Sequence, residues 1–260
     1  MVGKDLIMAT LFGSGGGSSG SGWGGDWPEA PDDGKTRLYI HLSEGRTSPM
    51  IGMKVNGLVT IDWGDRTEPY ELSGTSTNAI VWTTNHEYTS PGFYVITITV
   101  EGAAKFAGVN SVNQYSAILR ASDETDGRNN VYQNAVRRVE IGSGFANIDA
   151  YSFQDCRALQ SVKLPEGITN IYTYAFQYCD SLSIVKIPGS VALIAQNAFY
   201  GCYSVAYYDF TSHTAVPTLA SSNVFAGIPA DCEIRVPAAL YDEWIAATNW
   251  ATCADYIKAY

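Results

Sequence analysis

The sequence predicts a mostly β protein in which a small β-sandwich precedes a solenoid that ends in a helical cap. Three observations carry this fold class. Residues 35–101 alternate apolar and polar side chains in short runs between turn signals, as half-buried strands do. The second half of the chain repeats its apolar positions every 23 residues, which is typical of stacked repeats. Residues 237–260 place Leu240, Trp244 and Ala247 on one face of a helix, which predicts an amphipathic cover for the last repeat.

Composition and charge bound the class of protein. The 260 residues are enough for one large domain or two modest ones, and a hydrophobic content of 46% excludes wholesale disorder. The 26 acidic and 16 basic residues give a net charge of −10. Such a chain repels phosphate backbones, so no nucleic-acid partner is expected. No apolar run approaches the ~20 residues that cross a bilayer, so no membrane span is expected either.

Residues 1–34 are predicted to be a flexible tether. Residues 13–25 read GSGGGSSGSGWGG, a composition that cannot fold alone. The segment is either an untidy terminus or a strap that becomes ordered on a partner protein, and Trp23 and Trp27 favour the strap. Residues 1–12 lack the long apolar centre and cleavage site of a secretory signal. The Gly/Ser stretch also lacks the lysine and strand context of a phosphate-binding loop, so no cofactor is predicted.

Two segments of the predicted sandwich carry a family resemblance. VTIDWGDRTEPY at residues 59–70 and NHEYTSPGFYVITITV at residues 85–100 resemble the aromatic-Gly-Asp-Gly turn and the His-x-Tyr ending of polycystic-kidney-disease (PKD) domains, which are immunoglobulin-like. The sequence departs from that pattern at Arg66, where the family usually has glycine, so the turn after Asp65 is expected to differ. The resemblance implies an extracellular or particle-exposed spacer or binding module without catalytic activity.

One grouping in this module has the residue types of a catalytic or metal site. Asp62 and Asp65 are possible cation ligands, and His86, next to Glu87, is a possible base. The competing interpretation is structural: Asp65 accepts hydrogen bonds from turn amides, and His86 packs or hydrogen bonds at a strand end. The structural interpretation is favoured, and no metal site is predicted.

Residues 102–134 are interpreted as a junction and an N-terminal cap for the solenoid. Within them, Ser116 to Arg120 is a candidate strand of either neighbouring part.

The repeat is expected to span residues 135–236. Six columns of side chains share the 23-residue spacing. They are Val139, Val162, Val185 and Tyr208; Ile141, Leu164, Ile187 and Phe210; Ile148, Ile171 and Ile194; Phe153, Phe176 and Phe199; Cys156, Cys179 and Cys202; and Leu159, Leu182 and Val205. One unit cannot bury its apolar face alone, so stacked units are expected to form a continuous core. Phe225 lies 26 residues after Phe199, which predicts a bulged fourth unit.

The clearest unit carries a second, more specific resemblance. It contains Ile-Pro at residues 187–188, Val-x-x-Ile at 191–194 and Ala-Phe-x-x-Cys at 198–202, and these elements resemble the BspA-type leucine-rich repeat. The resemblance implies adhesion or recognition at a surface.

The five cysteines are predicted to be mostly free. Side chains that stack in one column and point the same way lack the dihedral angle of a disulfide, and a parallel row does not converge on a metal. Whether Cys232 and Cys253 pair is left open.

The strand pattern predicts which side chains face solvent. Residues between the inward columns form one row with Arg138 and Tyr207 and another with Lys163 and Lys186, while Tyr151 and Tyr174 decorate turns elsewhere. These six residues are the candidate ligand-binding set. The simpler alternative is that the charged side chains are only solvated and the tyrosines pack between units.

Two functions fit these expectations, and neither is enzymatic. The first is a non-catalytic adhesion or recognition protein, extracellular or at the cell surface, whose solenoid binds a host protein or a glycan. The alternative is a virion component, such as a phage tail or particle-surface protein, whose N-terminal segment contacts neighbouring subunits. No nucleophile–base pair or cofactor motif supports an enzyme.

Overall fold

The computed structural model describes residues 30–106, 118–120 and 132–260. Most of the predicted tether, residues 1–29, and most of the predicted junction therefore lie outside the described residues. Residues from Asp33 to Tyr260 form one compact unit, and this unit is mostly β, as predicted.

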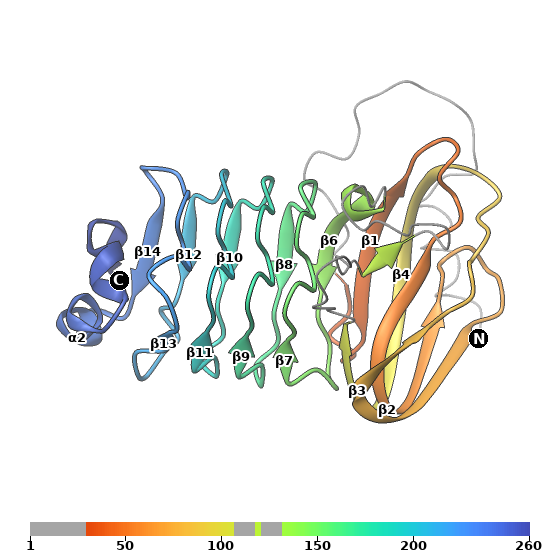
Figure 1. The fold of residues 1–260 in the computed structure, drawn as a ribbon, viewed down its shortest axis with the longest axis horizontal. Helices are drawn as coiled ribbons and strands as arrows, with labels where there is room; N and C mark the ends of the chain where they lie inside the picture. Colours follow the sequence, from red (N-terminus) through yellow and green to blue (C-terminus); the bar gives the residue numbers. More distant parts are fainter. Residues whose placement is uncertain (1–29, 107–117, 121–131) are drawn as a thin grey trace. The chain divides into compact units, whose positions relative to one another are not determined.

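The strands that precede the repeat form one antiparallel sheet in the order β1-β4-β2-β3 (Figure 1). They are β1 (Thr36–Leu42), β2 (Met50–Asp62), β3 (Tyr70–Trp82) and β4 (Gly92–Phe106). The last three are longer than the short strands predicted, and β4 continues beyond residue 101. The two-residue β5 (Leu119–Arg120) pairs with β2, so the end of the candidate strand Ser116–Arg120 that the structure describes belongs to this sheet and not to the repeat.

Three glycines lie side by side across β3, β2 and β4. Gly57 is paired with Gly74 on one side and with Gly102 on the other. Gly57 and Gly102 have φ angles of 119° and 115°, which side-chain-bearing residues rarely adopt. A Cβ atom on Gly57 would lie 2.1 Å from the carbonyl oxygen of Glu101. The close approach of these strands therefore requires glycine at this point of the sheet.

Each of the four units from β6 to β13 contributes one strand to each of two parallel sheets, and β14 adds a further strand to the first (Figure 1). The first sheet contains β6 (Val136–Glu140), β8 (Ser161–Lys163), β10 (Ile184–Lys186), β12 (Tyr207–Asp209) and β14 (Glu233–Val236). The second contains β7 (Asn147–Ile148), β9 (Asn170–Ile171), β11 (Leu193–Ile194) and β13 (Thr218–Leu219). The pairing follows the 23-residue period, with Val162 opposite Val139 and opposite Val185.

Equivalent side chains of successive units stack between the two sheets. Phe153, Phe176, Phe199 and Phe225 form a ladder with ring centroids 5.2, 5.3 and 5.7 Å apart and ring planes within 7° of parallel. These distances are slightly larger than the ~4.8 Å between hydrogen-bonded strands, as expected for rings carried by successive units. Phe225 joins this ladder although its unit is longer, because the extra residues lie outside the stacked positions.

The antiparallel sheet and the first repeat sheet are continuous. β1 pairs antiparallel with β6, which places β1 beside the first strand of the repeat. The register shifts here: Tyr39 pairs with Arg138 and Ile40 with Val136, which leaves Arg137 as the extra residue of a β-bulge. The 3₁₀ helix η2 (Gln133–Ala135) leads directly into this bulge.

The predicted helical cap is helical only in part. Residues 237–260 form η3 (Ala238–Leu240), the six-residue α2 (Tyr241–Ala246), η4 (Trp250–Tyr256) and the strand β15 (Ile257–Ala259). Trp244 and Trp250 are fully buried, contact each other at 5.2 Å and both pack edge-on against Phe210, with centroid distances of 5.5 and 5.4 Å. β15 pairs parallel with β14 and so extends the first repeat sheet. No helix in the described ranges is long and apolar enough to cross a membrane.

All five cysteines are free and buried. The Cys179 and Cys202 thiols donate hydrogen bonds to the carbonyl oxygens of Phe153 and Phe176, both at 3.2 Å. Burial raises the pKa of Cys202 to about 12, so hardly any reactive thiolate exists near neutral pH.

Titration with a thiol reagent is therefore expected to find no fast-reacting group in the folded protein. After unfolding in guanidinium without reductant, the same reagent is expected to find five thiols. Three or fewer thiols in the unfolded protein would show that a disulfide forms and would contradict the structure.

Candidate functional site

The outer face of the first repeat sheet is the surface on which four of the six candidate binding residues were predicted. Val162, Val185 and Tyr208 point inward and are buried. Strand alternation turns their neighbours outward. We call this surface the outer face; its two rows are Arg138, Ser161, Ile184, Tyr207 and Glu233, and Glu140, Lys163, Lys186, Asp209, Arg235 and Lys258.

Arg138 is occupied by contacts at the first end of the outer face. Its guanidinium forms an ion pair with Glu140 and lies 5.2 Å from the ring centroid of Tyr39. Tyr39 is 2% exposed. Arg138 therefore packs at the junction between β1 and β6 and contacts residues of both strands.

Tyr207 is likewise occupied at the other end. The Arg235 guanidinium lies 3.6 Å from the Tyr207 ring centroid and 4.7 Å from that of Tyr260, a position suited to cation–π contacts with both rings. Glu233 accepts hydrogen bonds from Arg235 Nε at 2.7 Å and from the Tyr260 hydroxyl at 2.9 Å. This cluster fastens the chain terminus to the sheet.

Lys163 and Lys186 are the two cations at the centre of the outer face. Both are exposed, and they occupy adjacent positions in neighbouring strands. Their acidic neighbours in the row are engaged elsewhere: Glu140 by Arg138, and Asp209 by the Thr211 hydroxyl at 2.7 Å. In the part of the chain that the structure describes, neither lysine forms an ion pair. Like charges on neighbouring strands destabilise a sheet, so the protein tolerates this pair at a cost to stability.

Tyr151 and Tyr174 form a second, separate surface. They lie in the turns after β7 and β9, on the second sheet, and their rings stack with centroids 5.0 Å apart. Their φ angles of 64° and 59° are left-handed, a conformation that costs a bulky residue roughly 1–2 kcal/mol. Asn197, the equivalent residue of the next unit, has a φ angle of 56°. The predicted six-residue site is therefore divided between two surfaces.

Asp62, Asp65 and His86 each form local hydrogen bonds, and Asp62 accepts one from the Gly64 amide at 2.9 Å. Asp65 accepts hydrogen bonds from the Thr67 amide at 3.2 Å and the Thr67 hydroxyl at 2.7 Å, and its other oxygen lies 2.7 Å from His86 Nε2. The His86 ring stacks on Trp63 at 4.5 Å.

Arg66, where the PKD pattern has glycine, takes a left-handed φ of 71°, so arginine adopts here the kind of backbone conformation that glycine favours. Within the described ranges, no group of three or more histidine, cysteine, aspartate or glutamate side chains is placed to hold a metal.

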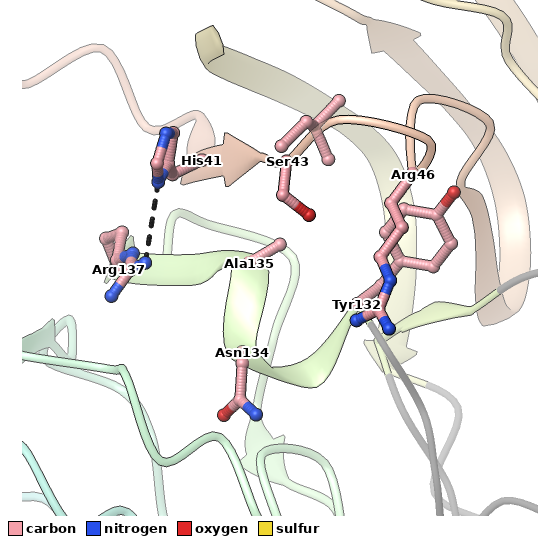
Figure 2. A pocket seen from close by; sticks show the side chains of 8 residues that line it. His41, Ser43, Arg46, Tyr132, Asn134, Ala135 and Arg137 are labelled. Carbon is pink, nitrogen blue, oxygen red and sulfur yellow. Dashed lines mark hydrogen bonds between the residues drawn. The ribbon is translucent and has the colours of Figure 1, made fainter. Parts of the chain in front are cut away.

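A pocket that was not predicted lies where β1 meets β6 (Figure 2). Its volume is about 230 Å³, and it is lined by His41, Leu42, Ser43, Arg46, Tyr132, Asn134, Ala135 and Arg137. The lining contains two arginines and one histidine but no carboxylate. No pattern in the sequence indicated this site, because its residues come from two distant segments, 41–46 and 132–137, that only the β1–β6 pairing brings together.

Comparison with known families identifies the repeat. Residues 127–237 match the model of the BspA type leucine rich repeat region, in six copies. The match covers all of β6 to β14. Proteins with BspA-type repeats are commonly surface adhesion or recognition proteins, and the family is generally non-catalytic. No curated protein and no solved structure matches the chain. The resemblance of residues 35–101 to PKD domains stays a prediction.

Proposed function

We propose that the protein is a non-catalytic adhesion or recognition protein, extracellular or at the cell surface, that binds a host protein through the outer face of its BspA-type solenoid. Residues 35–101 act as a PKD-like spacer that presents this face. The BspA-type match supports the general function, and the observation that carries the choice of surface is the unpaired lysine couple, Lys163 and Lys186.

The chemistry of the outer face indicates the kind of partner surface. Ile184 is 39% exposed and belongs to the same strand as Lys186. An exposed apolar side chain beside two free ammonium groups complements an acidic protein patch with an apolar centre. A glycan is the other possible ligand, and it is distinguished by the experiment below.

The alternative function, a virion component tethered through residues 1–34, depends on a segment of which the structure describes only residues 30–34. No observation favours it.

The double variant Lys163→Glu/Lys186→Glu is expected to reduce binding of the full chain to cultured epithelial cells at least about tenfold, because two attractive contacts become repulsive. Binding is measured by flow cytometry with the labelled protein. Lys35→Glu/Arg66→Glu, which makes the same charge change at exposed positions off the outer face, is the control and is expected to bind as the parent does.

Three results would contradict the proposal. The first is that the parent protein shows no saturable binding to the cells. The second is that the two charge variants lose cell binding equally. The third is that Tyr151→Ala/Tyr174→Ala loses cell binding while the lysine variant keeps it. Pretreatment of the cells with protease is expected to abolish binding. If binding is lost only after glycosidase treatment of the cells, the ligand is a glycan and the assignment to a protein is overturned.

A further inference from the structure

The pocket at the β1–β6 junction is positively charged within an acidic protein. Arg46 and Arg137 form no ion pair in the described ranges, whereas the whole chain carries a net charge of −10. Figure 2 shows Arg137 beside His41 on one wall and Arg46 on the opposite side of the pocket. An unpaired guanidinium that is partly withdrawn from water attracts an oxyanion strongly.

The β-bulge is what turns Arg137 toward the pocket. Because Arg138 pairs with Tyr39 and Val136 with Ile40, Arg137 has no opposite residue in β1. Bulges are known to re-aim a side chain beside functional sites. The Arg137 Nη2 atom lies 3.5 Å from His41 Nδ1, and the His41 ring stacks on Phe93 at 4.1 Å. These contacts hold the guanidinium in place before any ligand arrives, which lowers the entropic cost of binding.

The remaining lining residues indicate which other chemical groups the ligand carries. Buried Leu42 and Ala135 supply apolar contacts, and exposed Ser43 and Asn134 supply a hydroxyl and an amide at the rim. The volume of about 230 Å³ is below the ~300–1,000 Å³ of sites for drug-sized molecules, so it suits one small ring and not a chain segment. Burial and the charge of Arg137 lower the pKa of His41, so its imidazole is neutral at pH 7 and adds a polar contact without charge.

We propose that this pocket binds a single acidic monosaccharide unit, with the sugar carboxylate on the Arg137 guanidinium and the sugar hydroxyls toward Ser43 and Asn134. Arg46, on the opposite side, adds to the positive potential. The site is separate from the outer face and does not depend on the function proposed for that face.

Calorimetric titration of the full chain with D-glucuronate tests this site. Saturable binding is expected, with D-glucose and the methyl ester of glucuronate at least about tenfold weaker, because neither offers a carboxylate to Arg137. Arg137→Gln is expected to weaken glucuronate binding about tenfold or more. Arg46→Gln, in an exposed loop where the fold is not at risk, is expected to weaken it severalfold, and Arg66→Gln is the control and is expected to leave it unchanged.

The outcomes separate this site from the outer face. Lys163→Glu/Lys186→Glu is expected to leave glucuronate binding intact even where cell binding is lost. No saturable binding of glucuronate would overturn the proposal, as would equal affinity for glucose. Acetate binding as tightly as glucuronate would overturn the assignment to a sugar. Equal weakening by Arg46→Gln and Arg66→Gln would overturn the placement in this pocket.

Discussion

Replacing Phe176 with alanine is expected to lower the free energy of unfolding by about 3–5 kcal/mol. The side chain is 0% exposed and stacks between Phe153 and Phe199 at 5.2 and 5.3 Å. The backbone of each unit is hydrogen-bonded to the next, as from the Phe176 amide to the Ala198 carbonyl at 2.8 Å. The units therefore cannot collapse into the cavity, and two ring contacts are lost with the buried area.

Urea unfolding, followed by circular dichroism and by fluorescence, measures this loss, and coincident transitions justify a single free energy. Tyr203→Ala is the control, since Tyr203 is 54% exposed, and its effect is expected to stay within about 0.5 kcal/mol. A loss below about 1.5 kcal/mol for Phe176→Ala would show that the ladder contributes less than its burial implies.

Replacing Gly57 with alanine is expected to cost about 3 kcal/mol or more. Its φ of 119° is strained for any residue with a side chain. The added methyl group would also lie 2.1 Å from the Glu101 carbonyl oxygen, and backbone cannot move aside as a flexible side chain would. The two effects add because one acts on the residue itself and the other on the neighbouring strand.

Gly167→Ala separates these effects. Gly167 has a φ of 103° but no atom within 4 Å of an added Cβ, so this variant is expected to show only the backbone strain, roughly 1–2 kcal/mol. The measurement is the same urea titration. Equal losses in the two variants would mean that the strands separate to relieve the clash, and that the close approach at Gly57 contributes little to stability.

The repeat could be predicted because its packing depends on position within a unit. The inward residues of β8, β10 and β12 recur at the same spacing, so the sequence alone identifies Val162, Val185 and Tyr208 as one buried column. The outward rows follow by alternation: Lys163, Ile184 and Lys186 are exposed, whereas Glu140, predicted to face solvent, is buried at 5% exposure beside Arg138. The left-handed turns were harder to predict. Asparagine at position 197 is typical of a left-handed residue, but the equivalent residues Tyr151 and Tyr174 are not of a type that favours this conformation.

The parts that were not predicted depend on pairing between segments that do not repeat. The contact of β1 with β6 joins residues about 100 positions apart, and no local pattern encodes such a pairing. The pocket could not be predicted for the same reason, because it is this pairing that places His41 beside Arg137. The engagement of Arg138 and Tyr207 also depends on residues outside the repeat, since Tyr39 contacts Arg138 and Tyr260 lies with Tyr207 against Arg235. At the end of the chain, the three residues of β15 are too few to show alternation, although pairing with β14 makes them a strand.

The strands at the two ends of the repeat determine how the array can change in length during evolution. An unpaired strand edge would recruit another chain, but β1 covers β6 and β15 covers β14. A duplicated unit placed after β15 would meet no matching apolar surface, whereas one copied between β8 and β10 would find both sheets and the phenylalanine ladder in register. The array is therefore expected to gain or lose units from its interior, by 23 residues for each regular unit, while both end strands stay as they are.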